Sequence, residues 1–411
     1  MDARITNRIL VARGLRAFAD GYVSLLLPLY LLDLGYSPLQ IGVLATATLL
    51  GSGVLTLLVG LRGYRYQYRT VLLAATLLMI ATGVGFASIT QFWPLLLIAI
   101  VGTLNPSSGD VSVFLPLEHA MLSRAVSDRE RTAAFARYSL VGSLLGATGS
   151  LVAGTPSLLP ELLGISMTNS LRFMFVLYAA LGLVTALLYR GLPKATPTEA
   201  PVSAAPLTKS KKHVYVLATL FSLDAFGGGF VVQSMVALWL YQRFGLSSAT
   251  VGLVFFWTGV LAALSFLAAV RIAKRIGLVN TMVFTHIPSS LCLIAIPFMP
   301  HLSYVIVLLL IRSALSQMDV PTRSSYVMAI VSPEERPAAA SITSVPRSIA
   351  AAASPSLAGY MLGLSVFGWP LIAAGVVKIV YDLLLLAMFR KVRPPEERPL
   401  PPSASAASAT R

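Results

Sequence analysis

Long apolar runs separated by short polar segments occupy most of the chain. Twelve of these runs reach the roughly 20 residues that a helix needs to cross the hydrocarbon core of a bilayer. The pattern therefore predicts an all-α integral membrane protein with twelve transmembrane helices. We expect these helices over residues 14–34, 39–61, 70–90, 93–122, 131–154, 170–190, 213–241, 247–270, 278–299, 302–330, 335–363 and 367–390.

A long polar connection divides the predicted helices six and six. It covers residues 191–212, is rich in Pro, Ala, Thr and Ser, and ends in a basic cluster, which is typical of a flexible linker. We expect a six-helix bundle over residues 1–190, a cytoplasmic linker over 191–212 and a second six-helix bundle over 213–390. Residues 391–411 offer no apolar face and are predicted to form a disordered cytoplasmic tail.

Composition supports a membrane protein and argues against a nucleic-acid-binding one. Hydrophobic residues make up 56% of the chain and charged residues 11%, against about 25% charged in soluble proteins. The net charge of +15 is spread in short basic groups between apolar runs rather than gathered on one soluble domain. The lipid bilayer is therefore the expected partner, and no nucleic acid is expected.

The distribution of basic residues predicts the orientation. Lys and Arg recur near the N-terminus, in the loops that follow even-numbered helices and in the tail, whereas only Arg172 and Arg243 fall in loops of the opposite face. Loops rich in Lys and Arg stay in the cytoplasm. We expect a multi-pass protein of the plasma membrane, in a bacterium the inner membrane, with both termini cytoplasmic.

The two halves of the chain repeat each other. Residues 16–22 read RAFADGY and residues 224–230 read DAFGGGF, an offset of 208. Residues 127–134 (SDRERTAA) and 332–339 (SPEERPAA) match at an offset of 205, which aligns Glu118 with Arg323. Transporters are commonly built from such internal repeats, so the two bundles are predicted to be pseudo-symmetric.

Two six-helix repeats joined by a basic loop resemble the major facilitator superfamily. The family's motif loop after helix 2 corresponds to residues 60–69 (GLRGYRYQYR), which keep Gly60, Arg65 and Arg69 but place Tyr64 where the family usually has aspartate. The resemblance implies a monomeric secondary transporter that moves a small molecule by alternating access, with proton coupling.

A second motif resembles the family's exporters. Their helix 5 signature corresponds to residues 149–154 (GSLVAG), and helix 11 carries a related segment, residues 354–359 (SPSLAG). The matching residues are Gly149, Gly154, Pro355 and Gly359. The resemblance favours proton-coupled efflux of a drug or metabolite, with proton-coupled uptake by symport as the alternative. Small residues also serve plain helix packing.

Other classes of protein find little support in the sequence. A membrane-embedded enzyme would need a nucleophile–base set or a metal motif, and no H-E-x-x-H, G-x-S-x-G or P-loop pattern occurs. A receptor built on a transporter fold would be expected to carry a large additional domain. We therefore expect neither an enzyme nor a receptor, no cofactor, and no metal site, since the four His residues lack ligand spacing.

Ionisable residues inside predicted spans are the candidate functional residues, because each costs about 2.5–3.5 kcal/mol or more in the bilayer. Asp20, Asp110, Asp224 and Asp319 lie near the centres of helices 1, 4, 7 and 10, which line the central cavity in the resembled family. They are candidates to carry protons or hold a cation. Alternatively, neighbouring arginines neutralise them, as in the i,i+4 pairs Arg16–Asp20 and Asp319–Arg323.

Six further residues are candidates for substrate contact or charge pairing. Glu118 is predicted either to pair with Arg323 across the halves when the cytoplasmic side closes, or to pair with Arg137 inside its own half. Lys378 and Asp382, one turn apart on helix 12, are expected to pair. The six candidates are Arg16, Glu118, Arg137, Arg312, Arg323 and Arg347.

Two predicted helices contain residues that interrupt helical hydrogen bonding. Asn105 and Pro106 lie near the middle of helix 4, and Gly227, Gly228 and Gly229 lie in helix 7. The backbone groups freed at such breaks can bind substrate, or the breaks can simply kink the helices.

Overall fold

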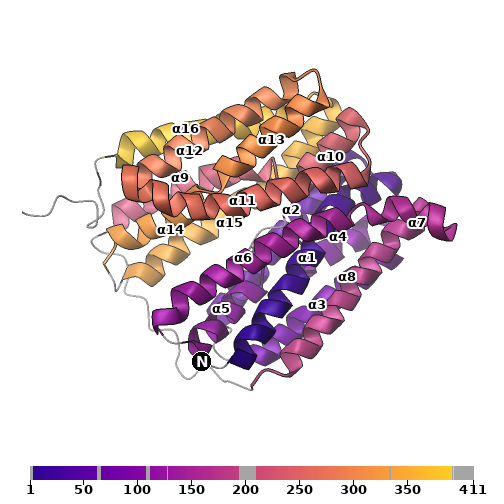
Figure 1. Cartoon of the computed structure of the whole chain (residues 1–411), viewed down its shortest axis with the longest axis horizontal. Helices are drawn as coiled ribbons and strands as arrows, with labels where there is room; N and C mark the ends of the chain where they lie inside the picture. The colour runs from indigo at the N-terminus through magenta and orange to yellow at the C-terminus, as the bar shows by residue number, and fades with distance from the viewer. Residues whose placement is uncertain are drawn as a thin grey trace, which may run out of the picture.

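The computed structural model describes residues 3–62, 66–107, 112–126, 128–193, 210–332, 335–390 and 392. Within these ranges every element is helical, and the helices form two groups side by side (Figure 1). The first group contains α1 (Ala3–Asp33), α2 (Pro38–Arg62), α3 (Tyr68–Ser88), α4 (Phe92–Val101), α5 (Phe114–Ala125), α6 (Asp128–Val152), α7 (Thr155–Leu163) and α8 (Met167–Arg190).

The second group repeats this order along the chain. It contains α9 (Lys211–Gly229), α10 (Gln233–Phe244), α11 (Ser248–Ile276), α12 (Leu278–Ala295) with the short 3₁₀ helix η2 (Ile296–Phe298), α13 (Leu302–Ser316), α14 (Asp319–Ile330), α15 (Arg336–Leu364) and α16 (Trp369–Phe389). Six predicted spans fall in each group, because α4 with α5, α9 with α10 and α13 with α14 each form one interrupted span.

The membrane-spanning character of these helices follows from their length and apolarity. By these criteria nine spans among the described residues qualify directly. The other three predicted spans are the interrupted α4–α5, and α6 and α15 with 25 and 29 residues, which are long enough but less apolar. The prediction of an all-helical twelve-span membrane protein is confirmed. Helix α7, outside the predicted spans, is an addition that the apolar pattern did not indicate.

Two of the three helix breaks lie where Pro and Gly weaken the hydrogen-bond ladder. Helix α4 ends at Val101, and the side-chain oxygen of Asn105 accepts a hydrogen bond from the Ser107 amide (3.0 Å), which replaces a helical partner near Pro106. The second break directly follows the glycine run of α9. There the Ser234 amide donates to the Pro106 carbonyl (3.0 Å), so the two breaks meet across the halves.

The two groups contact each other mainly through α2 against α15 and α6 against α11. Gly42 of α2 lies directly against the Pro355 carbonyl, and Gly359 of α15 against the Pro38 carbonyl. Thr46 accepts a hydrogen bond from the Ser356 amide (3.0 Å) at the same seam. Glycine allows this approach because a β-carbon at either position would overlap backbone atoms of the other helix.

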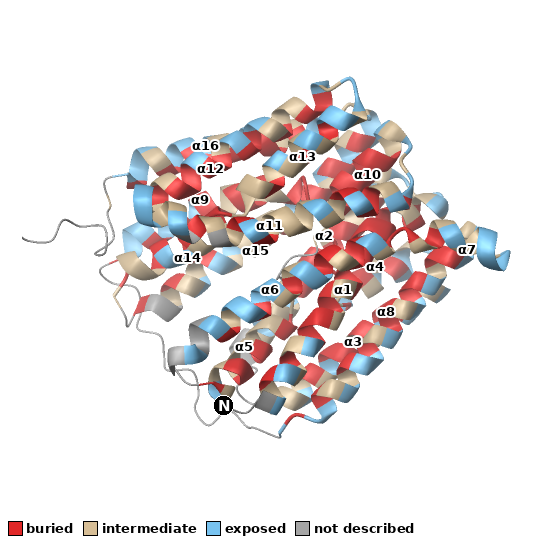
Figure 2. Cartoon of the chain, viewed as in Figure 1, coloured by how far each residue is buried: buried red, intermediate tan, exposed pale blue. Residues whose placement is uncertain are grey.

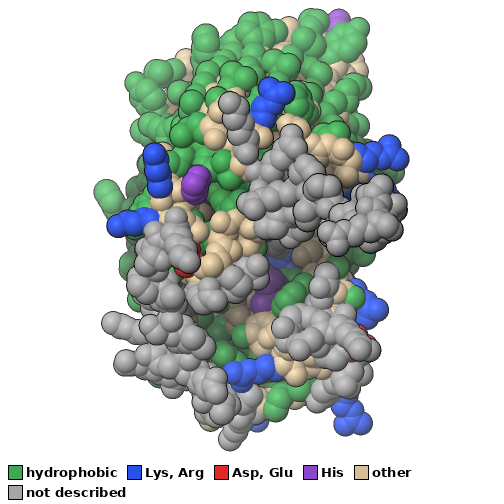
Figure 3. Space-filling model, turned by 90° about the vertical axis from the view of Figure 1, so that its left-hand side faces the viewer, with side chains coloured by type: hydrophobic (Ala, Val, Ile, Leu, Met, Phe, Trp, Pro, Cys, Tyr) green, Lys and Arg blue, Asp and Glu red, His purple; other side chains and the backbone are tan. Residues whose placement is uncertain are grey.

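The halves are joined at one end and apart at the other. At the joined end the residues of α10 are largely buried (Figure 2), and the Tyr241 hydroxyl donates to the Leu25 carbonyl (3.2 Å). Toward the end where α1 begins and α16 finishes, the two groups diverge (Figure 1). Figure 3 views that end and shows a hollow near its centre. The molecule is therefore closed at one end and open at the other.

Candidate functional site

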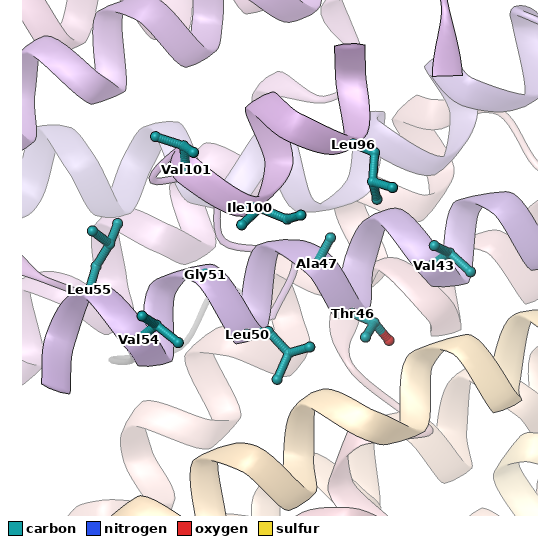
Figure 4. Close-up of a pocket in the computed structure, with 10 residues that line it drawn as sticks. All are labelled: Val43, Thr46, Ala47, Leu50, Gly51, Val54, Leu55, Leu96, Ile100 and Val101. Carbon is teal, nitrogen blue, oxygen red and sulfur yellow. The ribbon is translucent and has the colours of Figure 1, made fainter. Parts of the chain in front are cut away.

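An apolar pocket of about 460 Å³ lies between α2 and α4 (Figure 4). Its one polar lining side chain is Thr46, whose hydroxyl is engaged with Ser356. Such a lining offers no group that would orient a polar or charged substrate. The ionisable side chains are gathered elsewhere, in one cluster inside each half. The lining residues are Val43, Thr46, Ala47, Leu50, Gly51, Val54, Leu55, Leu96, Ile100 and Val101.

The first cluster surrounds Glu118, which is fully buried on α5 (0% exposed). Its carboxylate forms an ion pair with Arg16 of α1 and accepts hydrogen bonds from Tyr138 of α6 (2.5 Å) and Tyr189 of α8 (2.5 Å). The Arg16 guanidinium also lies over the Phe114 ring, 4.0 Å from its centre. One carboxylate thus ties four helices together, with its charge compensated and its oxygens hydrogen-bonded.

Two sequence-based pairings of this half are wrong. Arg137 was one of the two partners proposed for Glu118, but Arg137 is exposed, while Tyr138, the next residue, bonds to Glu118. A helix turns its side chains by about 100° per residue, so adjacent positions point in different directions. The expected i,i+4 pair of Arg16 with Asp20 is also replaced, because Arg16 bonds to Glu118 instead.

Asp20 is buried (8% exposed) without a direct partner. Within the described residues its carboxylate makes neither a hydrogen bond nor an ion pair. Arg16 and Arg13 are near enough to attract it electrostatically, although the Arg16 guanidinium is engaged with Glu118. Asp110, the predicted acid of helix 4, lies outside the described residues.

The second cluster surrounds Asp224 of α9. Its two carboxylate oxygens accept hydrogen bonds from Lys378 of α16 (2.6 Å) and Arg323 of α14 (2.9 Å). Arg323 also pairs with Asp319 one turn earlier on α14 (3.2 Å), which confirms the predicted i,i+4 pair. Asp224 and Asp319 therefore both have basic partners in direct contact, unlike Asp20.

A histidine extends this cluster to α12. His286 Nδ1 lies 3.0 Å from a carboxylate oxygen of Asp382, and its Nε2 lies 3.4 Å from Lys378 Nζ. The predicted Lys378–Asp382 pair is wrong, since Lys378 bonds to Asp224 and Asp382 to His286. The sequence analysis missed His286, although a histidine within an apolar span is itself a signal of a buried polar contact. Within the described part of the chain, no three His, Cys, Asp or Glu residues gather in a metal-binding arrangement.

The side chains of Arg312 and Arg347 have no hydrogen-bond or ion-pair partner in the described residues. Both are half-buried, and the Nε atom of each is buried without an acceptor. Arg312 on α13 lies near Cys292 of α12, and Arg347 on α15 lies near Arg323. Arg347 therefore belongs to the surroundings of the second cluster without bonding to any of its acids.

The motif residues mainly lie at helix contacts. Gly149 lies against the Phe18 carbonyl of α1, and Gly154 approaches Ala249 of α11, so this exporter-like segment packs helices together. The motif loop is described only in part. Gly60 is in the last turns of α2, Arg69 donates to the Leu192 carbonyl (3.4 Å), and Arg65 lies outside the described residues.

The glycines of α9 have two different surroundings. Gly229 lies against the Ala351 carbonyl of α15, and Gly227 lies among side-chain and backbone atoms of α16. Gly228 has more space and faces the Lys378 ammonium, 3.7 Å from where a β-carbon would be. The run thus permits both close helix contact and the break that follows it.

Comparisons with known proteins agree with this architecture. The model of the Major Facilitator Superfamily matches residues 9–311 and 217–410. An uncharacterized membrane protein of Saccharomyces cerevisiae, YJR124C, is 25% identical over 91% of this chain and 92% of its own length. The crystal structure of the nucleoside transporter NupG matches with a TM-score of 0.75 and 13% identity, covering 94% of this chain and 100% of that one. A bacterial homolog of the human lysosomal transporter Spinster, inward-facing and unoccupied, matches with a TM-score of 0.70 and 15% identity, covering 93% and 95%.

Proposed function

The chain belongs to the major facilitator superfamily, and on that premise we propose that it exports a small molecule in exchange for protons. Membership of the family confirms a multi-pass membrane transporter rather than an enzyme. The proposal adds three points to this: the coupling to protons, the residue that carries them, and the direction of transport.

The proposal of proton coupling rests on the surroundings of Asp20. Four other buried acids of the spans, Glu118, Asp224, Asp319 and Asp382, each contact a basic side chain directly. Asp20 is equally buried but makes no such contact within the described residues. A buried carboxylate without a partner is costly when charged, and binding a proton removes that cost. Among the acids that the structure describes, Asp20 is therefore the one best placed to gain and release a proton during transport.

The open and closed ends support alternating access. The basic loops predict that the open end, where α1 begins and α16 finishes, faces the cytoplasm. The closed end is held by backbone approaches at Gly42 and Gly359 and by a few hydrogen bonds across the seam. Separating such a seam exposes few polar groups, so the bundles can rock apart there while the other end closes.

The direction of transport is proposed from the exporter-like residues, which lie at the α1–α6 and α2–α15 contacts and, for Gly154, against Ala249 of α11. Gly149, Gly154, Pro355 and Gly359 all lie where helices approach closely, at or near the seam that must open outward. Uptake by proton symport remains the alternative, because these contacts would serve either direction.

Everted and right-side-out membrane vesicles distinguish the two directions. In energised everted vesicles, an exported compound added outside should release the pH gradient, read as recovery of a quenched acridine dye. In right-side-out vesicles without an imposed gradient, a symported compound should instead make the external medium alkaline. A panel of nucleosides, organic anions and amphipathic cations supplies the compounds, and Asp20→Asn vesicles supply the control. Alkalinisation outside right-side-out vesicles, without release of the pH gradient in everted vesicles, would mean that the protein takes the compound up rather than exports it. The absence of a response to any compound would contradict proton coupling.

A further inference from the structure

Arg347 lies on the side of α15 that faces α9, at the level of the second cluster. One turn later on the same side, the Ala351 carbonyl lies against Gly229 of α9, and two turns later the Ser354 hydroxyl donates to the Phe226 carbonyl (2.5 Å). This register places Arg347 beside the part of α9 that carries Asp224. Of the charged groups around Arg347, Arg323 acts on it most strongly and repels it, while Asp224 and Asp319 attract it.

The acids of the cluster already have other partners. Asp224 bonds to Lys378 and Arg323, and Asp319 pairs with Arg323. Within the described residues, no acceptor is left in contact with the Arg347 guanidinium, and its Nε atom is buried without a hydrogen bond. The buried part of the guanidinium therefore lacks an acceptor and lies near the like charge of Arg323, an arrangement that a bound anion would stabilise.

Arg347 lies in the first half of α15 and is accessible from one side. Ser348 of α15 approaches Gly53 of α2, so α15 lies between α9 and α2. Ser344 is exposed near the start of α15, although Ser354, further along the helix, is buried. Figure 3 shows the hollow between the halves at this end. Arg347 is half-buried, so part of its side chain is accessible to a solute, whereas Arg323 is buried.

We infer that Arg347 binds an anionic group of the transported molecule, a carboxylate or a phosphate. The planar guanidinium offers paired N–H donors that match two oxygens of either group, a geometry that the ammonium of lysine cannot reproduce. The bound anion would supply the missing acceptor and would offset the repulsion between Arg347 and Arg323. This assignment of the substrate class rests on the proposed transport function, although binding can be measured without transport.

Ligand-induced thermal stabilisation of the purified full chain in detergent tests the inference. The probes are benzoate and inorganic phosphate, with neutral benzamide and cationic benzylammonium as matched controls for benzoate. We expect benzoate, phosphate or both to raise the melting temperature in a saturable way, and the two controls to leave it unchanged. A response to one anion alone identifies the carboxylate or the phosphate as the recognised group.

Variants locate the binding group. Arg347→Gln should weaken anion binding about ten- to hundredfold, the loss expected for a charge-assisted hydrogen bond. Arg347→Lys should weaken it less, because it keeps the charge but loses the planar fork. Arg243→Gln, at an exposed position in the last turn of α10 at the closed end, is the matched control and should bind as the unchanged protein does.

Three results would overturn the inference: no anion stabilises the protein, the benzamide control stabilises it as well as benzoate, or Arg347→Gln keeps the original affinity. If Arg347→Gln does not fold, Arg347→Lys takes its place, and an anion affinity equal to that of the unchanged protein would overturn the inference. Anion binding through Arg347 without any vesicle response would refute the proposed proton-coupled export and leave the anion site standing. A vesicle response without anion binding through Arg347 would refute the anion site alone.

Discussion

Glu118 and Arg323 occupy equivalent positions in the two repeats, and each forms the same interhelical ion pair with the charges exchanged. Glu118 of α5 pairs with Arg16 of α1, and Arg323 of α14 pairs with Asp224 of α9. The repeat offsets of 205 and 208 make Arg16 the equivalent of Asp224 as well. In each half, a buried ion pair therefore joins the first and fourth spans of the bundle. The acid lies on the fourth span in the first half and on the first span in the second half.

These two pairs should stabilise the halves independently. Glu118→Gln leaves Arg16 buried without its counter-charge, and we expect a loss of about 3–5 kcal/mol in unfolding free energy. Replacing both partners, as in Arg16→Met with Glu118→Met, should recover part of this loss. Thermal unfolding in detergent measures both, with exposed Arg137→Gln as the control. An unchanged melting temperature for Glu118→Gln would show that the pair contributes nothing.

The predicted approach of Glu118 and Arg323 across the halves stays a prediction for the state in which the open end closes. In the present state both residues are engaged inside their own halves. A double-mutant cycle on the accessibility of a cysteine probe at the open end measures the coupling. With each residue held by its own partners, we expect a coupling below about 0.5 kcal/mol, as for independent sites. A larger value would establish a gate pair.

Asp20 and Asp224 should respond oppositely to the same substitution. Asp20→Asn removes a buried charge that has no direct partner, so stability should be kept or raised while proton-driven transport is lost and substrate exchange is retained. Asp224→Asn removes the shared partner of Lys378 and Arg323 and should lower the melting temperature. Melting curves and vesicle assays on both variants test this contrast. If Asp20→Asn transports with unchanged proton coupling, Asp20 is not the carrier.

Gly42 and Gly53 on α2 offer a matched test of the closed seam. A β-carbon at Gly42 would overlap the Pro355 carbonyl, whereas at Gly53 the nearest atom is the Ser348 β-carbon at 3.9 Å. We expect Gly42→Ala to open the closed end and Gly53→Ala to leave it unchanged. Thiol labelling of Gln233→Cys in a Cys292→Ser background reports the opening. Equal labelling in both variants would mean that the seam does not depend on this approach.

The topology can be tested by reporter fusions. Ser37 and Ser247 precede α2 and α11 at the closed end, and the positive-inside rule predicts this end to be external. Fusions there should report outside, and a fusion at Ser203, in the linker beyond the described residues, should report inside. A reversed result at any site would overturn the orientation, and with it the assignment of the open end to the cytoplasm.

The spans and two of the three helix breaks could be predicted from local sequence because their causes are local, whereas the break between α13 and α14 was not predicted. In lipid every backbone group must bond within its own helix, so a long apolar run predicts a span, and Pro106 or the glycines of α9 predict an interruption. The pair Asp319–Arg323 was predictable for the same reason, since both residues lie one turn apart on one helix. The repeat also indicated two related bundles before any contact was known.

The partners of the other charges were decided by the tertiary structure. Glu118 bonds to Arg16, 102 positions away, and the direction in which each side chain points depends on the rotation of its helix within the bundle. Lys378 and Asp382 share one side of α16 yet bond to different helices, since α9 brings an acid to the one and α12 a histidine to the other. Local sequence contains neither that rotation nor those neighbours. Packing of the bundles therefore decided which charges were neutralised and which side chains, Asp20, Arg312 and Arg347, have no direct partner in the described part of the chain.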